Sequence, residues 1–140
     1  MAQAIEFVGN HLLLVGGFVM LLVLFIANEM RRGGRSISPQ QLVHMVNREN
    51  AVVLDVRDRK EFQAGHIVDS VNIPFSALGD RLSELERYRQ QPIVVACKMG
   101  QHSGAAGMQL RKAGFENVQR LAGGIAEWRN ASLPVVKGNG

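Results

Sequence analysis

VVACKMGQHSGAA, residues 94–106, is the stretch from which the rest of the chain can be interpreted. Its first three residues belong to a short apolar run, Ile93 to Ala96, that is typical of a buried parallel strand. It ends at the start of a segment, Gly104 to Lys112, in which Ala105, Ala106, Met108 and Leu110 favour a helix, and Gly114 follows where a C-terminal glycine cap is expected. Between the predicted strand and the predicted helix lies Cys97, the single cysteine among 140 residues.

The position of Cys97 predicts a nucleophilic sulfur. A loop that joins a parallel strand to a helix N-terminus directs backbone N–H groups at one point and favours an anion there, and a thiolate is an anion. The alternative is a small buried hydrophobic residue, which describes most free cysteines. Cys97 follows the strand rather than lying inside it, and Gly100 allows the loop to fold around it. We therefore favour the nucleophile.

A series of short motifs resembles the rhodanese-like sulfurtransferase family. The segment CKMGQHS (97–103) and the helix after it are similar to the family's active-site loop. Each motif is weak alone, but their shared order over about Ser36 to Pro134 is specific. The other motifs that carry the resemblance are DVR (55–57), EF (61–62), GHI (65–67), NIP (72–74), Leu121, GGI (123–125) and Trp128.

The resemblance implies a three-layer α/β/α fold with a central parallel sheet, and the alternation of predicted strands and helices favours the same class. It also implies sulfur transfer: the Cys97 thiolate attacks a donor such as thiosulfate, forms a persulfide, and passes the sulfur to a thiol or protein acceptor. No cofactor is implied. The substrate-binding residues would be those of the loop, namely Lys98, Met99, Gly100, Gln101, His102 and Ser103.

One position departs from the family pattern. Many members have arginine five residues after the cysteine, where this chain has His102. Phosphatases of the same fold have a loop one residue longer, closed by an arginine that clamps phosphate. Ser103 occupies that position here, which counts against a phosphatase. The other alternative is a non-enzymatic, membrane-tethered sulfur carrier or protein-docking module, and the retained Cys97 counts against a purely structural role.

Charged residues also follow the predicted strand at 51–56, at the edge where ligands gather in open α/β sheets. We expect Asp55, Arg57 and Glu61 to form an ion-pair and capping network that supports the loops, rather than to bind substrate. Asp58 is predicted to cap the next helix. His66 is interpreted as a hydrogen-bonded structural residue. No paired Cys or His spacing predicts a metal site.

The N-terminal region predicts a membrane anchor. Phe7 to Asn28 contains no Asp, Glu, Lys or Arg and is long enough to cross a bilayer as one helix. A secretory signal peptide needs a positive leading region, whereas Glu6 is the one charged side chain before this run. A buried core helix is seldom apolar all round for so long. We predict one transmembrane helix and a short basic linker in residues 1–35, and a rhodanese-like domain in residues 36–140.

Charge predicts the orientation and the partners. Arg31, Arg32 and Arg35 follow the apolar run, so the positive-inside tendency places the catalytic domain in the cytoplasm, at the cell membrane and most simply the bacterial inner membrane. The bilayer is then one partner, and a membrane protein is a second partner class. The net charge is +4, and apart from those arginines the cationic side chains are scattered among acidic ones, which argues against nucleic acid.

Three further local expectations concern secondary structure. Ser38 with Pro39 and Gln41 predicts a helix that starts with a capping box. Leucines at helical spacing predict a helix over 76–89. Residues 137–140 are expected to be a frayed tail.

Overall fold

The computed structural model describes residues 2–32 and 34–139, except for the side chains of residues 29–32. The side chains of Arg31 and Arg32, on which the predicted orientation rests, therefore lie outside the description. Contacts divide the chain into two compact units, Met1–Arg31 and Arg32–Gly140. Each unit is described by itself.

The N-terminal unit is a pair of helices, α1 (Ala2–Asn10) and α2 (Leu12–Arg32). The sequence predicted one uninterrupted apolar helix, but the helix breaks at His11, where Gly9 and Asn10 have low helix propensity. The His11 ring stacks on Phe7, with 4.5 Å between ring centroids. Of the described helices, none alone has the length and hydropathy needed to cross a bilayer; Ala2–Asn10 and Leu12–Asn28, bent by 79°, meet both criteria only as a pair.

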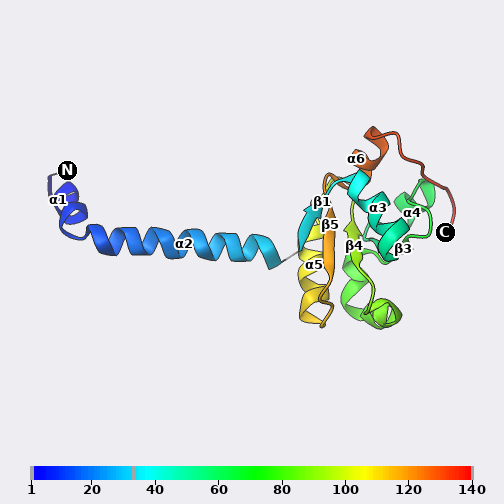
Figure 1. Ribbon diagram of the computed structural model, residues 1–140, viewed down its shortest axis with the longest axis horizontal. Helices are drawn as coiled ribbons and strands as arrows, with labels where there is room; N and C mark the ends of the chain where they lie inside the picture. The colour runs from blue at the N-terminus through cyan, green and yellow to red at the C-terminus, as the bar shows by residue number, and fades with distance from the viewer. Residues whose placement is uncertain (1, 33, 140) are drawn as a thin grey trace. The chain divides into compact units, whose positions relative to one another are not determined.

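The second unit contains a five-stranded parallel sheet with the strand order β1-β5-β4-β2-β3 (Figure 1). This confirms the predicted α/β class with a central parallel sheet. The first strand was missed because it is only three residues long and contributes one buried apolar side chain, Ile37. The strands are β1 (Arg35–Ile37), β2 (Val52–Asp55), β3 (Val71–Asn72), β4 (Ile93–Ala96) and β5 (Val118–Leu121).

Alternating side chains of the strands build a hydrophobic core on each face of the sheet. In β4, Val95 packs with Leu110 of α5, whereas Val94 belongs to the core that includes Leu42 of α3 and Trp128 of α6. Helices therefore cover both faces, which gives three layers. The helices of this unit are α3 (Pro39–Glu49), α4 (Arg59–Ala64), α5 (Ser103–Lys112) and α6 (Gly124–Asn130).

The capping box at the start of α3 is confirmed. The Gln41 backbone N–H donates to Ser38 Oγ at 3.2 Å, and the Ser38 N–H donates to Gln41 Oε1 at 2.8 Å. These two bonds satisfy orphan donors of the first turn, so they fix where α3 begins after β1.

The predicted helix over 76–89 is wrong in type. It is two 3₁₀ segments, η1 (Phe75–Asp80) and η2 (Leu82–Tyr88), separated by Arg81. Gly79 lowers α-helix propensity at the break, and Leu78 and Leu85 are fully buried against the sheet. Tertiary burial of these two leucines therefore outweighs the helical spacing of the sequence.

The C-terminal segment is held by hydrogen bonds as far as Asn139, so the prediction of a frayed tail is wrong for 137–139. Val136 and His66 exchange backbone hydrogen bonds in an isolated antiparallel bridge. The Gly138 N–H donates to the Gln63 carbonyl at 2.9 Å, and Gln63 Nε2 donates to Asn139 Oδ1 at 2.7 Å. Gly140 lies outside the described residues.

Candidate active site

The loop from β4 to α5 folds around the sulfur of Cys97. Cys97 is 2% exposed, and the Gly100 N–H donates to Cys97 Sγ at 2.8 Å. Gly100 has φ +97°, a conformation that L side chains rarely adopt, so glycine is what lets this N–H turn inward. A backbone donor at this distance stabilises negative charge on the sulfur.

The start of α6 fixes the same loop from the other side. The Ile125 and Ala126 N–H groups donate to the carbonyls of Cys97 and Lys98 at 2.8 and 3.1 Å. Gly124 has φ +61°, and a Cβ there would overlap the Cys97 carbonyl. The GG pair at 123–124 therefore permits a close approach that holds the cysteine in place.

Side chains inside the loop complete its shape. Gln101 Oε1 accepts from the Met99 N–H at 2.9 Å and lies 3.7 Å from Cys97 Sγ, within reach of the thiol proton. Ser103 is buried, and its hydroxyl donates to the Gly100 carbonyl at 3.1 Å. Gln101 and Ser103 thus order the backbone of the loop, a role that sequence reasoning did not give them.

A cavity of about 270 Å³ opens beside Cys97. The loop residues predicted as catalytic or substrate-binding divide into two groups. Cys97, Lys98, Gln101 and His102 line this cavity, whereas Met99, Gly100 and Ser103 do not. The His102 ring stacks on Phe75, with 5.1 Å between centroids and 20° between planes. The remaining lining comes from Val56, Arg57, Asp58, Glu61, Phe75 and Ser76.

Comparison with known proteins places this geometry in a family. Residues 38–131 match the family model of the rhodanese-like domain. The chain belongs to the rhodanese-like domain family. That match spans most of the chain and includes Cys97, every residue that lines its cavity, and strands β2 to β5.

Individual relatives include a named sulfurtransferase and a solved rhodanese-related protein. The Escherichia coli (strain K12) protein named "Uncharacterized protein YibN" is 32% identical over 142 residues, which cover 99% of this chain and 99% of that one. "Thiosulfate sulfurtransferase GlpE" of Pseudoalteromonas translucida is 33% identical over 97 residues, covering 69% of this chain and 90% of that one. The crystal structure of a rhodanese-related protein from Thermoplasma volcanium superposes with a TM-score of 0.68 at 36% identity, covering 74% and 99%. The family thus includes sulfurtransferases.

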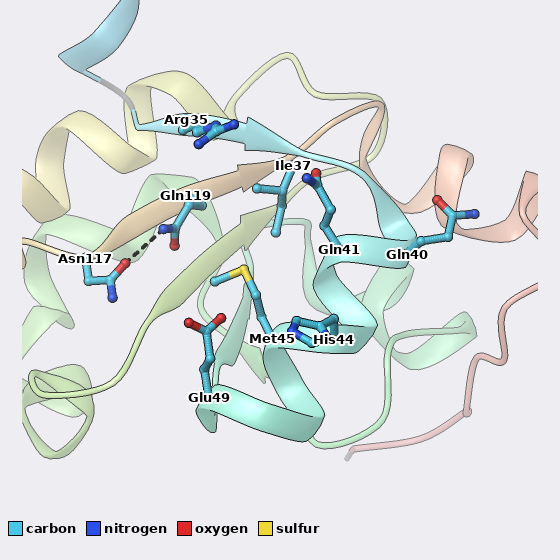
Figure 2. A pocket seen from close by; sticks show the side chains of 9 residues that line it. All are labelled: Arg35, Ile37, Gln40, Gln41, His44, Met45, Glu49, Asn117 and Gln119. Atoms are coloured by element: carbon cyan, nitrogen blue, oxygen red, sulfur yellow. Dashed lines mark hydrogen bonds between the residues drawn. The ribbon is translucent and has the colours of Figure 1, made fainter.

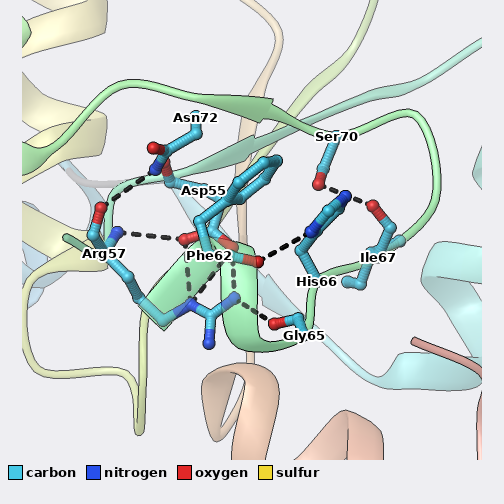
Figure 3. A network of polar contacts seen from close by, with 8 residues as sticks. All are labelled: Asp55, Arg57, Phe62, Gly65, His66, Ile67, Ser70 and Asn72. Carbon is cyan, nitrogen blue, oxygen red and sulfur yellow. Dashed lines mark hydrogen bonds and ion pairs between the residues drawn. The ribbon is translucent and has the colours of Figure 1, made fainter. Parts of the chain in front are cut away.

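Next to the cavity of the rhodanese-like domain lies a buried ion pair (Figure 3). Arg57 Nη2 lies 2.7 Å from Asp55 Oδ2, and the exposed side-chain fractions are 6% and 0%. Arg57 also donates through Nε to both carboxylate oxygens and through Nη2 to the Gly65 carbonyl at 2.7 Å. Asn72 Nδ2 donates to the Asp55 and Arg57 carbonyls, which ties β3 to the same network. The network therefore connects the end of β2 to the chain on either side of α4, since Arg57 precedes this helix and Gly65 follows it.

The structure separates Glu61 from this network. Among the described residues, Glu61 makes no ion pair with Arg57, and its half-buried side chain lines the Cys97 cavity instead. Asp58 precedes α4 as expected but makes no side-chain hydrogen bond to the backbone, so its predicted capping bond is wrong. Asp58 also lines the cavity. The two carboxylates therefore line the same cavity as the candidate nucleophile.

His66 is a buried, hydrogen-bonded residue, as the sequence predicted. Its Nδ1 lies 2.7 Å from the Phe62 carbonyl, and its ring stacks on the Phe62 ring at 3.7 Å between centroids (Figure 3). It does not line the Cys97 cavity.

A larger hollow of the domain, about 470 Å³, lies beside α3, over the β1–β5 edge of the sheet (Figure 2). Most of its lining residues are polar, although Ile37 and Met45 give it apolar surface, and Gln119 Nε2 donates to Asn117 Oδ1 at 2.9 Å. None of the described residues that line it is a cysteine or another activated nucleophile. The smaller Cys97 cavity is therefore the candidate active site.

Proposed function

We propose that this protein is a membrane-anchored rhodanese-like sulfurtransferase. It moves sulfane sulfur from a donor such as thiosulfate to a thiol or protein acceptor through a persulfide on Cys97. The observation that carries the proposal is the Gly100 N–H at 2.8 Å from Cys97 Sγ, beside a cavity that a small donor can enter. The sulfurtransferase names among the relatives support the same reaction.

The reaction consists of two displacements at sulfur. In the first, the Cys97 thiolate attacks the outer sulfur of thiosulfate; the Cys97 S–S bond forms, and sulfite leaves with the electron pair of the broken bond. In the second, an acceptor thiol or cyanide attacks that outer sulfur, and Cys97 leaves as the thiolate. The Gly100 N–H stabilises the sulfur anion at the start and at the end of the cycle.

Two cationic positions assist the anionic donor in this proposal. Lys98 and His102 line the cavity, and the stack on Phe75 holds the His102 ring beside it. A protonated imidazole in this position supplies the positive charge that many family members obtain from arginine. Arg57 lines the same cavity, but its charge is already matched by Asp55.

The N-terminal helices form the anchor in this proposal, and residues 36–140 lie in the cytoplasm. Support comes from the exposed apolar side chains of α2, such as Leu13 at 93% and Phe18 at 67%, and from the arginines that follow them in the sequence. Protease added to sealed cells should leave the domain intact, whereas digestion from outside, or a processed N-terminus near Ala27, would contradict the proposal.

Activity of the full chain separates the proposed enzyme from its alternatives. Thiosulfate:cyanide sulfur transfer should be measured beside hydrolysis of a phosphate ester, for wild type and Cys97→Ser. We expect Cys97-dependent sulfur transfer and no phosphate hydrolysis. Cys97-dependent hydrolysis of the ester would favour a phosphatase. A persulfide that forms on Cys97 but reaches no small acceptor would favour the sulfur carrier, and no persulfide at all would favour the docking module.

A further inference from the structure

The cavity beside Cys97 is lined by both acidic and basic side chains. Asp58 and Glu61, at the start of α4, form its acidic wall. Lys98 and His102, from the cysteine loop, add a positive charge and an imidazole to the lining. A site built only to bind a dianion such as thiosulfate has no use for two carboxylates, because like charges repel the donor.

Arg57 does not neutralise the acidic wall. It also lines the cavity, but its guanidinium group is paired with Asp55, a side chain that is 0% exposed. Among the described side chains, neither Asp58 nor Glu61 has a salt-bridge partner. Both carboxylates therefore stay available to a cationic group of a ligand.

Size and polarity narrow the class of ligand. About 270 Å³ is just below the roughly 300–1,000 Å³ of typical small-molecule pockets, so the cavity suits a compact molecule. Val56 and Phe75 add a small apolar surface to the charged lining. A ligand that matches these features has a short aliphatic carbon chain, an ammonium group and an anionic group.

We propose that the sulfur acceptor is a small zwitterionic aminothiol, of which free cysteine is the simplest. Its ammonium group binds the carboxylates of Glu61 and Asp58, and its carboxylate faces Lys98 and His102. Glu61 is then a residue that determines acceptor specificity, not a member of the support network. This inference rests on the proposed sulfur transfer and names the acceptor for it.

The transfer balances without another reactant. The acceptor sulfur attacks the outer sulfur of the Cys97 persulfide, a new S–S bond forms, and the bond from the outer sulfur to Cys97 Sγ breaks. If the persulfide is anionic and the acceptor enters as a thiol, the acceptor's proton ends on the terminal sulfur of the product. Cys97 is released as the thiolate, ready for the next donor.

The test compares two acceptors in matched variants of the full chain. Cysteine has the ammonium group, and N-acetylcysteine has the same thiol and carboxylate but no ammonium group. In Glu61→Gln, we expect kcat/KM for cysteine to fall about three- to tenfold. A loss of this size lies between the free energy contributed by an exposed ion pair and that contributed by a buried hydrogen bond to a charged group. The value for N-acetylcysteine should stay the same or rise, and loading of Cys97 by thiosulfate should become faster because one repelling charge is gone.

Glu116→Gln is the matched control. Glu116 is exposed and precedes β5, at the opposite end of the parallel sheet from the Cys97 loop, and it does not line the cavity. This variant should leave both acceptor rates unchanged. Asp58→Asn provides a second test of the acidic wall, because asparagine is an equally good residue before a helix, and it should shift the acceptor ratio in the same direction as Glu61→Gln.

The outcomes separate this inference from the proposed function. Equal changes for cysteine and N-acetylcysteine in both cavity variants, or no change for either, would overturn the aminothiol acceptor while leaving sulfur transfer intact. Absence of a persulfide on Cys97 of the wild-type protein after thiosulfate treatment would overturn both. A selective loss of cysteine as an acceptor, with thermal stability unchanged, supports the inference.

Discussion

Replacing Arg57 with alanine should strongly destabilise the rhodanese-like domain. The substitution removes three side-chain hydrogen bonds to Asp55 and one to the Gly65 carbonyl. Asp55, which is 0% exposed, would keep only the hydrogen bond from the residue-57 backbone N–H, which lies at 3.0 Å. A buried carboxylate would then lack its counter-charge, which is the costly way to break an ion pair.

The expected loss is about 3–5 kcal/mol of unfolding free energy, the usual cost of removing one partner of a buried pair. At about 4 °C per kcal/mol for a domain of this size, the midpoint of thermal unfolding should fall by roughly 12–20 °C. Arg81→Ala is the matched control, because Arg81 pairs with Glu84 at the surface, where the exposed fractions are 40% and 48%. Because both charges of that pair are exposed to solvent, Arg81→Ala should change stability far less than Arg57→Ala.

Trp128 gives the assay its signal. It is the one tryptophan of the chain, it is buried in the domain, and its Nε1 donates to the Pro134 carbonyl at 2.9 Å. Its fluorescence during thermal and denaturant unfolding of the full chain therefore reports on the domain. A loss in Arg57→Ala no larger than in Arg81→Ala would refute the support role. Unchanged stability with lost sulfur transfer would instead make Arg57 a substrate-binding residue.

Three further predictions concern the loop and the surface. Gly124→Ala should lower persulfide yield, measured by mass spectrometry, because the added Cβ would overlap the Cys97 carbonyl; an unchanged yield would show that the loop tolerates displacement. His102→Ala should reduce thiosulfate:cyanide turnover less than Cys97→Ser, since the backbone N–H on the sulfur remains; an equal loss would make the imidazole indispensable. The hydrogen bond from Arg89 holds the pKa of Glu86 below its usual 4.5. The pair therefore stabilises the domain above pH 4.5, and this stabilisation is lost as the pH falls through the lowered pKa of Glu86. Glu86→Gln should remove that part of the acid dependence in a pH series of unfolding curves, and an unaltered series would contradict it.

The strand, loop and helix around Cys97 could be predicted from the sequence because their signals are local. The apolar run at Ile93–Ala96 and the glycines after it are sufficient to place β4 and the loop, and Ser103–Lys112 forms the helix within a residue of the expected start. The capping box at Ser38 is equally local, since it depends on residues three positions apart. Such short-range patterns do not need the rest of the fold.

Features that depend on distant partners could not be predicted. Strand β1 exists because Arg35–Ile37 pairs with Gln119–Leu121, far along the chain. Glu61 was assigned to the Asp55–Arg57 network from its proximity in sequence, but the packing of α4 directs it to the Cys97 cavity. The break at His11 was hidden within a continuous apolar composition. In each case the sequence carries the residue type, and tertiary packing decides its neighbour.

The mass of the intact full chain after brief treatment with thiosulfate tests the central claim most directly. We predict a species heavier by one sulfur atom, located on the peptide that contains Cys97, and lost again on addition of cyanide or a thiol. Cys97→Ser, which should keep the fold because Cys97 contributes little to the core beyond its small volume, should gain no mass. A wild-type protein that remains unmodified, or a Cys97→Ser variant that gains the same sulfur, would contradict the account.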